Sequence, residues 1–409
     1  MAGTTTGEPV IFNPFEPGFF DDPYRQYAAL RKHDPVHRSP LEVWVLFRYD
    51  DIVSVLRDSS LSVQVDNATP TARMQMFAEQ APEERERGAH SILNVDPPDH
   101  TRLRRLVSKA FTPKMVHELR PRIQALVDDA LGSMAARGKA DLISDLAFPL
   151  PFTVISEMLG MPDGNRDEVR GWSHTLTKTL DPILSPEEVD AALVAASNMQ
   201  AHVQDVLAWK RDHPADDLLT GLLAAEDEGD RLSEIELLDQ VLLLYVAGHE
   251  TTVNLIGNAT LALLGHPDQL ARLRADPELD GGAVEELLRY DSPVQFSRRI
   301  TTADLDVAGT TIPAGTFTLT CLGSANHDEA RWGPTADELD ITRSDAGQHM
   351  SFGNGIHHCL GSSLARTEAQ VAIGTLVRRF PDLALAGEPE RNGRVVLRGL
   401  ESLPVTLGA

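Results

Sequence analysis

The pattern of apolar and polar positions along the chain predicts a mostly helical protein. Amphipathic or apolar segments with the helical period recur along the chain, and several have Ser, Asp or Pro near their starts. They cover residues 24–32, 51–57, 115–136, 149–159, 165–180, 186–212, 233–264, 267–275, 281–290 and 364–380. Short pieces with β-branched residues and Gly or Pro at their bounds predict strands at 36–39, 43–48, 297–300, 305–309, 316–322, 395–398 and 405–407. We therefore expect an α+β protein that is mainly α with a smaller β region.

The predicted helix 233–264 contains a run, residues 237–264, that is apolar around most of its circumference, as expected of a helix through the middle of a large domain. Inside it, Ala247 and Gly248 remove side-chain bulk, while Glu250 and Thr251 place an acid beside a hydroxyl. Polar groups in an apolar helix cost free energy unless they are solvated or used. Two interpretations follow. Either the hydroxyls bond back to carbonyls one turn earlier and the acid pairs with a base, or these residues form a site beside something flat.

A second informative stretch is residues 352–361. It is rich in glycine, contains Cys359 and directly precedes the amphipathic segment 362–380. A helix N-terminus favours an anionic sulfur at Cys359, which makes it a metal ligand. The other cysteine, Cys321, is far upstream, so a Cys-rich zinc site lacks ligands. A metal that brings its own equatorial ligands fits better, namely haem iron with an axial thiolate.

These two stretches resemble the cytochrome P-450 family. The pattern Phe-Gly-x-Gly-x-His-x-Cys-x-Gly is similar to the family's haem-binding loop and is filled by Phe352, Gly353, Gly355, His357, Cys359 and Gly361. The sequence Ala-Gly-x-Glu-Thr-Thr at 247–252 is similar to its oxygen-activation segment. The resemblance implies haem b (iron protoporphyrin IX) as cofactor and Cys359 as the metal ligand. It also implies that Thr251 organises the oxygen site, that Glu250 feeds protons, and that Phe352, Ala247 and Gly248 border the cofactor.

Further motifs of the family are matched elsewhere in the chain. Glu286 and Arg289 resemble its structural Glu-x-x-Arg pair, which locks the core behind the haem. The remaining matches imply partners for the haem propionates, because two carboxylates inside a protein need several donors. These partners are His100, Arg104, Arg299 and His357, with Arg298 as the rival of Arg299.

The resemblance runs from about residue 14 to residue 407, which implies one domain over 1–409 with the cytochrome P-450 fold. That fold is a triangular helical body with the haem between the long central helix and the cysteine helix. The implied function is a haem-thiolate monooxygenase that uses O2 to hydroxylate or epoxidise a bulky lipophilic small molecule such as a macrolide, steroid or terpenoid. Electrons would come from a separate ferredoxin and ferredoxin reductase, because the chain has no flavin or nicotinamide fingerprint. By family position, the substrate pocket includes Ile92, Leu243, Val294, Phe296 and Leu400.

The composition of the chain limits the classes of partner and the cellular locations that we expect. The net charge of −24 over 409 residues argues against nucleic acid as a partner, since phosphates would be repelled. Two cysteines exclude a disulfide framework and suit a reducing, cytoplasmic location. Residues 1–7 have neither a basic nor an apolar signal region, and no apolar run predicts a membrane anchor. We expect a monomer.

Two other functional classes use the same residues. A haem-thiolate sensor or carrier also needs Cys359 and the propionate donors, but it has no use for Glu250 and Thr251 in a central helix. A cysteine hydrolase could pair Cys359 with His357 or His358, yet these histidines have no evident orienting partner in the sequence.

Overall fold

The computed structural model describes residues 10–40, 43–70, 88–162, 164, 166–182, 184–227 and 229–408, so residues 1–7 lie outside the described part. The helices are α1 (Tyr24–His33), α2 (Tyr49–Arg57), α4 (Asp99–Ala110), α5 (Pro113–Arg137), α6 (Pro149–Leu159), α7 (Arg166–Thr177), α8 (Pro186–Asp212), α9 (Leu218–Ala224), α10 (Glu234–Gly265), α11 (Pro267–Ala275), α12 (Asp280–Tyr290), α13 (Leu322–Ala325), α14 (Glu329–Trp332) and α15 (Ser362–Arg379). The strands are β1 (Val36–Arg38), β2 (Trp44–Leu46), β3 (Lys139–Asp141), β4 (Glu226–Asp227), β5 (Asp230–Arg231), β6 (Phe296–Ile300), β7 (Leu305–Val307), β8 (Thr310–Ile312), β9 (Phe317–Cys321), β10 (Ala384–Leu385), β11 (Glu390–Arg391), β12 (Leu400–Ser402) and β13 (Pro404–Thr406).

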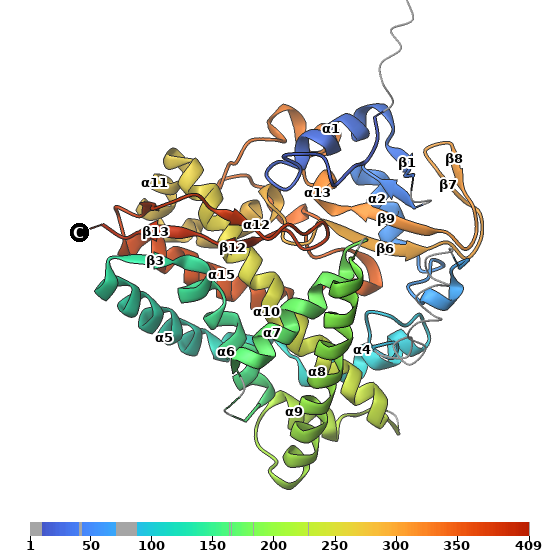
Figure 1. Cartoon of the computed structure of the whole chain (residues 1–409), viewed down its shortest axis with the longest axis horizontal. Coiled ribbons are helices and arrows are strands. Elements are labelled where there is room, and N and C mark those ends of the chain that lie inside the picture. Colours follow the sequence, from blue (N-terminus) through green and yellow to red (C-terminus); the bar gives the residue numbers. More distant parts are fainter. Residues whose placement is uncertain are drawn as a thin grey trace, which may run out of the picture.

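Helix α10 is the long central helix that the sequence predicts. It begins with a capping box, in which Ser233 Oγ accepts from the Glu236 N–H and the Glu236 carboxylate accepts from the Ser233 N–H at 2.8 Å. Its apolar circumference is buried by packing against α6, α8, α12 and α15. In Figure 1 it crosses the middle of the helical part, and α15 lies behind it. This arrangement sets the segment 247–252 inside the protein.

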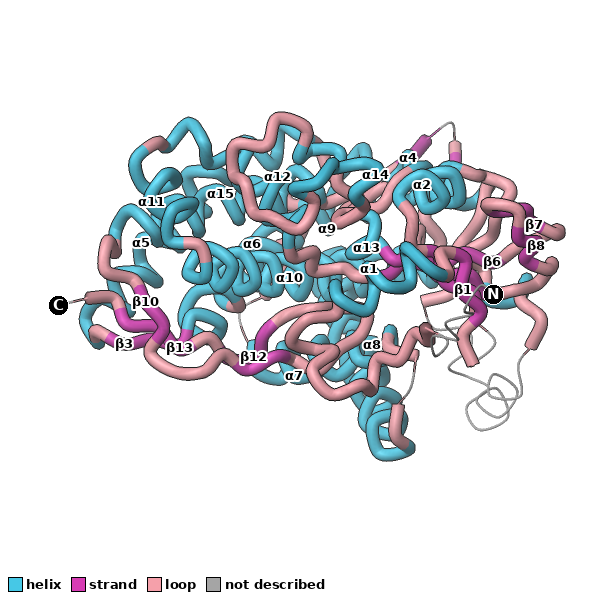
Figure 2. The backbone as a smooth tube through the Cα atoms, turned by 90° about the horizontal axis from the view of Figure 1, so that it is seen from above, coloured by secondary structure: helices cyan, strands magenta, loops and turns pink. Residues whose placement is uncertain are grey.

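The β region forms a four-stranded sheet in the order β1-β2-β9-β6, beside α1 and α2 (Figures 1 and 2). β2 and β9 run parallel, while the other neighbours are antiparallel. A smaller sheet, β10-β13-β3, lies at the other end of the molecule. Strand β6 brings Arg299 into register with Thr318 of β9. From there the Arg299 charge acts on His100 in the first turn of α4.

Two predicted elements differ in the structure. Residues 395–398 are not a strand, because the Val395 and Val396 N–H groups donate to the Asp181 carboxylate at 3.0 and 2.8 Å instead of to a ladder. Only Leu397 forms an isolated bridge, with Val294. The helix predicted over 165–180 ends at Thr177 and continues as a 3-10 turn. Helix α9 was not predicted. It is a short helix whose N-cap is Asp217.

Among the described residues, every helix is too short or too polar to cross a bilayer.

Candidate active site

The cysteine loop is built by backbone hydrogen bonds and two glycines in left-handed conformation. The Cys359 N–H donates to the Phe352 carbonyl at 2.9 Å, which closes the loop just before α15. Gly353 and Gly355 have φ of +68° and +69°. A Cβ on Gly355 would lie 2.2 Å from the Leu56 carbonyl oxygen, so only glycine lets the loop approach α2 this closely.

The surroundings of the Cys359 sulfur differ from the sequence-based expectation. Burial raises the pKa of the Cys359 thiol, and the Gly361 N–H, Arg104 and Arg366 offset only part of this rise. The helix end therefore does not by itself hold a thiolate here. A coordinating metal cation would, because metal binding deprotonates a thiol outright.

Four basic side chains gather beside this loop, and they are the predicted propionate partners. His100 and Arg104 come from α4, Arg299 from β6 and His357 from the loop itself. The His100 and His357 rings lie with centroids 4.3 Å apart. Burial lowers the pKa of His357 to about 3, and repulsion from Arg299, His100 and Arg104 adds to the effect. Burial also lowers the pKa of Arg299 to about 10, with Asp96 opposing this shift and Arg298 adding to it.

This cluster fits an anionic group. Both ring nitrogens of His100 are buried without a hydrogen-bonding partner, which is costly unless a ligand pairs with them. Burial, Arg104 and Arg299 all lower the pKa of His100, so the site repels cations and would favour carboxylates. Arg298 is engaged elsewhere, since its Nη2 donates to Asn94 Oδ1 at 2.7 Å.

In α10 the acid and the hydroxyl have different surroundings. Thr251 Oγ1 donates to the Ala247 carbonyl at 3.1 Å, the back-bonded arrangement that the first interpretation expects. Glu250 is buried, and within the described part of the chain its carboxylate accepts no hydrogen bond. Burial raises the pKa of its carboxyl, and Arg394 lowers it in part. An acid with a raised pKa can hold a proton near neutral pH and release it.

Arg394 was not expected from the sequence. Its Nη1 lies 4.0 Å from Glu250 Oε2, and its Nη2 contacts His174 Nδ1 at 2.9 Å. His174 Nε2 then lies 3.4 Å from the Glu401 carboxylate at the surface. The three residues come from α7, β12 and the loop before it, so no local sequence pattern connects them with Glu250.

Glu368 on α15 is a second buried acid that the sequence analysis missed. It is fully buried, and burial raises its pKa to about 8 despite the neighbouring Thr252 hydroxyl. A signal did exist. Glu368 lies four residues after Leu364 and four before Ala372, on the buried stripe of its helix.

The structure explains the small size of Gly248 without a cofactor. A Cβ there would lie 2.8 Å from Ile155 of α6, so glycine lets α6 pack closely on α10. The expectation that Gly248 borders the cofactor therefore rests on the resemblance alone.

Glu286 and Arg289 form a fully buried bidentate pair, with N–O distances of 2.7 and 2.8 Å. Arg289 also donates to the carbonyl oxygens of Asn326, Ala336 and Glu338. The pair thus fixes the irregular connection that leads to the cysteine loop.

The predicted pocket residues are only partly brought together. Ile92 packs in one apolar cluster with Leu243. Leu400 and Val294 belong to two other clusters, and the Phe296 ring lies among the aromatic rings of the N-terminal core, 5.5 Å from that of Phe12. Of these five residues, only Ile92 and Leu243 pack in the same apolar cluster.

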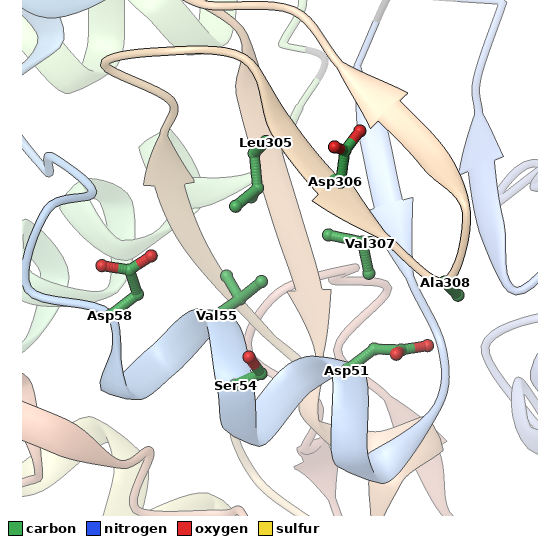
Figure 3. Close-up of a pocket in the computed structure, with 8 residues that line it drawn as sticks. All are labelled: Asp51, Ser54, Val55, Asp58, Leu305, Asp306, Val307 and Ala308. Atoms are coloured by element: carbon green, nitrogen blue, oxygen red, sulfur yellow. The ribbon is translucent and has the colours of Figure 1, made fainter.

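A cleft of about 160 Å³ between α2 and the β7–β8 hairpin is a poor alternative site (Figure 3). Its polar lining includes Asp51, Asp58 and Asp306 and no basic side chain. It would repel propionates, and it offers little apolar surface for a lipophilic molecule.

Comparison with known proteins agrees with the geometry. Residues 281–391 match the family model described as Cytochrome P450. Cytochrome P450 107B1 of Saccharopolyspora erythraea is 45% identical over 99% of this chain and 100% of its own length. The vitamin D(3) 25-hydroxylase of Pseudonocardia autotrophica is 44% identical over 100% of this chain and 99% of its own. The solved structure of myxobacterial cytochrome P450 CYP267B1 in complex with myristic acid has a TM-score of 0.88 at 39% identity, covering 97% of this chain and 98% of that one. This chain accordingly belongs to the cytochrome P450 family and is a haem-containing monooxygenase.

Proposed function

We propose that the protein hydroxylates a bulky lipophilic small molecule of the macrolide, steroid or terpenoid kind, with electrons from a ferredoxin and its reductase. The observation that carries the site is the cluster of basic groups around the buried His100, whose ring nitrogens lack hydrogen-bonding partners beside the Cys359 loop. The similarity to a vitamin D(3) 25-hydroxylase and to a cytochrome P450 that holds myristic acid supports a lipophilic substrate. The enzyme we propose is a monomer and is cytoplasmic.

Cys359 would coordinate the haem iron through its sulfur. His100, Arg104, Arg299 and His357 would hold the propionates by charge-assisted hydrogen bonds. When bound, the haem supplies the activation of O2 and the oxidation of the substrate C–H bond. Epoxidation of an alkene is the alternative outcome at the same site.

The residues of α10 would supply protons to this chemistry. Glu250 is suited to the role because it is a buried acid in α10 whose pKa is raised by burial, and Arg394, with Nη1 4.0 Å from Glu250 Oε2, offsets part of this rise. The Thr251 hydroxyl, now bonded to the Ala247 carbonyl, would turn to orient a proton donor. Ile92 and Leu243 would give the substrate an apolar surface.

The substrate class is tested by adding candidate lipids to the purified holoprotein and recording shifts of the Soret band. Macrolides, steroids and terpenoids should produce saturable shifts, whereas polar sugars and nucleosides should not. Binding of polar compounds alone would contradict the proposed class.

The axial ligand is tested separately, with Cys359→Ser. The wild-type protein should give the long-wavelength band of a reduced carbon monoxide complex with thiolate ligation, and the variant should lose it. Cys321→Ser is the matched control and should keep the band, because this thiol is fully buried in another core cluster.

A further inference from the structure

Glu285 lies next to the buried Glu286–Arg289 pair in sequence, but its carboxylate contacts Arg366 of α15 and His349, which precedes the cysteine loop. Arg366 donates to the Glu285 carboxylate in a bidentate fork, from Nε to Oε1 at 2.6 Å and from Nη2 to Oε2 at 3.0 Å. His349 Nε2 lies 3.2 Å from Glu285 Oε2. Burial raises the pKa of Glu285, but the hydrogen bonds from His349 and Arg366 outweigh it and hold this pKa at about 2. The carboxylate is therefore charged at neutral pH.

The tautomer of His349 follows from its second contact. The Ser351 N–H donates to His349 Nδ1 at 3.1 Å, so Nδ1 is an acceptor and the proton sits on Nε2, which donates to Glu285. Burial lowers the pKa of His349. The histidine is thus neutral, and the only full charges in the group are those of Glu285 and Arg366.

Arg366 connects this group with the sulfur in two ways. Its guanidinium lies over the Phe352 ring, 4.5 Å from the centroid, and the Phe352 carbonyl accepts the N–H of Cys359. Arg366 also lies on the second turn of α15, the helix that begins three residues after Cys359. No step of the proposed reaction uses either Glu285 or Arg366.

We propose that Glu285 and Arg366 are a positioning pair for the cysteine ligand, in which Arg366 sets the electrostatic potential at the sulfur and Glu285 attenuates it. This inference rests on the proposed role of Cys359. A cation near the thiolate stabilises the more negative, reduced state of the site and so raises its reduction potential. A carboxylate on that cation does the opposite.

The test is a mediated spectroelectrochemical titration of the substrate-free holoprotein. Glu285→Gln should raise the reduction potential of the haem iron, and Arg366→Gln should lower it. Each should change the ratio of reduced to oxidised protein at a fixed applied potential by about three- to tenfold, where tenfold corresponds to about 59 mV for one electron. The double variant should return close to the wild type, since both charges are then removed.

Opposite signs separate this inference from a purely structural role. If the pair only braced the loop, both single variants would loosen it and shift the potential in the same direction, with the same loss of the thiolate spectrum. Unchanged potentials in both variants would also overturn the proposal. Glu278→Gln is the matched control, because it removes the same charge at an exposed position and should leave the potential unchanged.

Two further measurements allow the potentials to be interpreted if a variant loses haem or if the wild type lacks the thiolate band. If Arg366→Gln does not retain haem, Arg366→Lys keeps the charge without the fork, and its potential should stay near that of the wild type. A wild-type protein without the thiolate band would refute the proposed axial ligand itself. A wild-type protein with the band, together with potentials that do not respond, would refute only the role of the pair.

Discussion

Arg298 and Arg299 are neighbours in β6, but their surroundings differ. Arg299 is buried, as is His100, and its charge acts on His357, whereas Arg298 donates a hydrogen bond to Asn94. We expect Arg299→Ala to weaken haem retention by about 10- to 100-fold, because it removes a charge-assisted bond of roughly 1.5–3 kcal/mol. Arg298→Ala should have a much smaller effect. Haem transfer to apomyoglobin measures both rates, and the reverse order would mean that the wrong arginine is assigned.

Thr251 and Thr252 are adjacent hydroxyls on different faces of α10. Thr251→Ala should leave haem content and substrate binding unchanged while product per reductant consumed falls by roughly tenfold or more, with peroxide released instead. The reason is that this hydroxyl is needed only after O2 has entered. Thr252 is buried beside Glu368, so Thr252→Ala should stay closer to the wild type in coupling. Full coupling in Thr251→Ala with failure in Thr252→Ala would move the role to Thr252.

Glu368 should make stability depend on pH. Burial raises its folded pKa to about 8, whereas an unfolded glutamate titrates near about 4.3. The stability that its bound proton contributes is therefore complete below pH 4 and is lost as the pH rises towards 8. Glu368→Gln should gain stability over the wild type between pH 5 and pH 8, on the order of a few kcal/mol.

Thermal unfolding of both proteins at several pH values measures this difference. Glu118→Gln removes a carboxylate that is 64% exposed, and it should show no such trend. If the difference in unfolding temperature between Glu368→Gln and the wild type stays constant from pH 5 to pH 8, Glu368 is ionised in the folded protein.

At the scale of elements, the approach of the cysteine loop to α2 depends on two glycines that can be compared directly. A Cβ on Gly353 meets nothing within 4 Å, so Gly353→Ala should cost only the strain of a positive φ, about 1–2 kcal/mol. Gly355→Ala adds a clash with the Leu56 carbonyl and should cost clearly more. Denaturant unfolding of the two variants gives these costs. Equal costs would show that the contact with α2 relaxes freely.

The elements that sequence could predict are those whose signal is local. The period of α10 and the glycines around Cys359 are contained in single stretches, and α10 and α15 begin within two residues of their predicted starts. The contacts of Glu250 could not be predicted in this way. Arg394 is 144 positions away and directly precedes the segment 395–398, which the sequence pattern predicts as a strand. In the structure, the Asp181 carboxylate accepts the backbone N–H groups of Val395 and Val396 instead.

At the scale of the whole molecule, the net charge of −24 predicts self-repulsion that salt should relieve. Salt also weakens surface ion pairs such as Arg122–Glu157. The two side chains of this pair are 48% and 40% exposed, and an exposed ion pair contributes at most about 1 kcal/mol to the free energy of unfolding. Repulsion should therefore dominate, and the unfolding temperature of the holoprotein at pH 7 should rise by about 2–4 °C between roughly 10 mM and 150 mM NaCl. Near pH 5, close to the isoelectric point of about 4.9, the same step should have little effect. A fall in unfolding temperature at pH 7 would show that ion pairs outweigh the net charge.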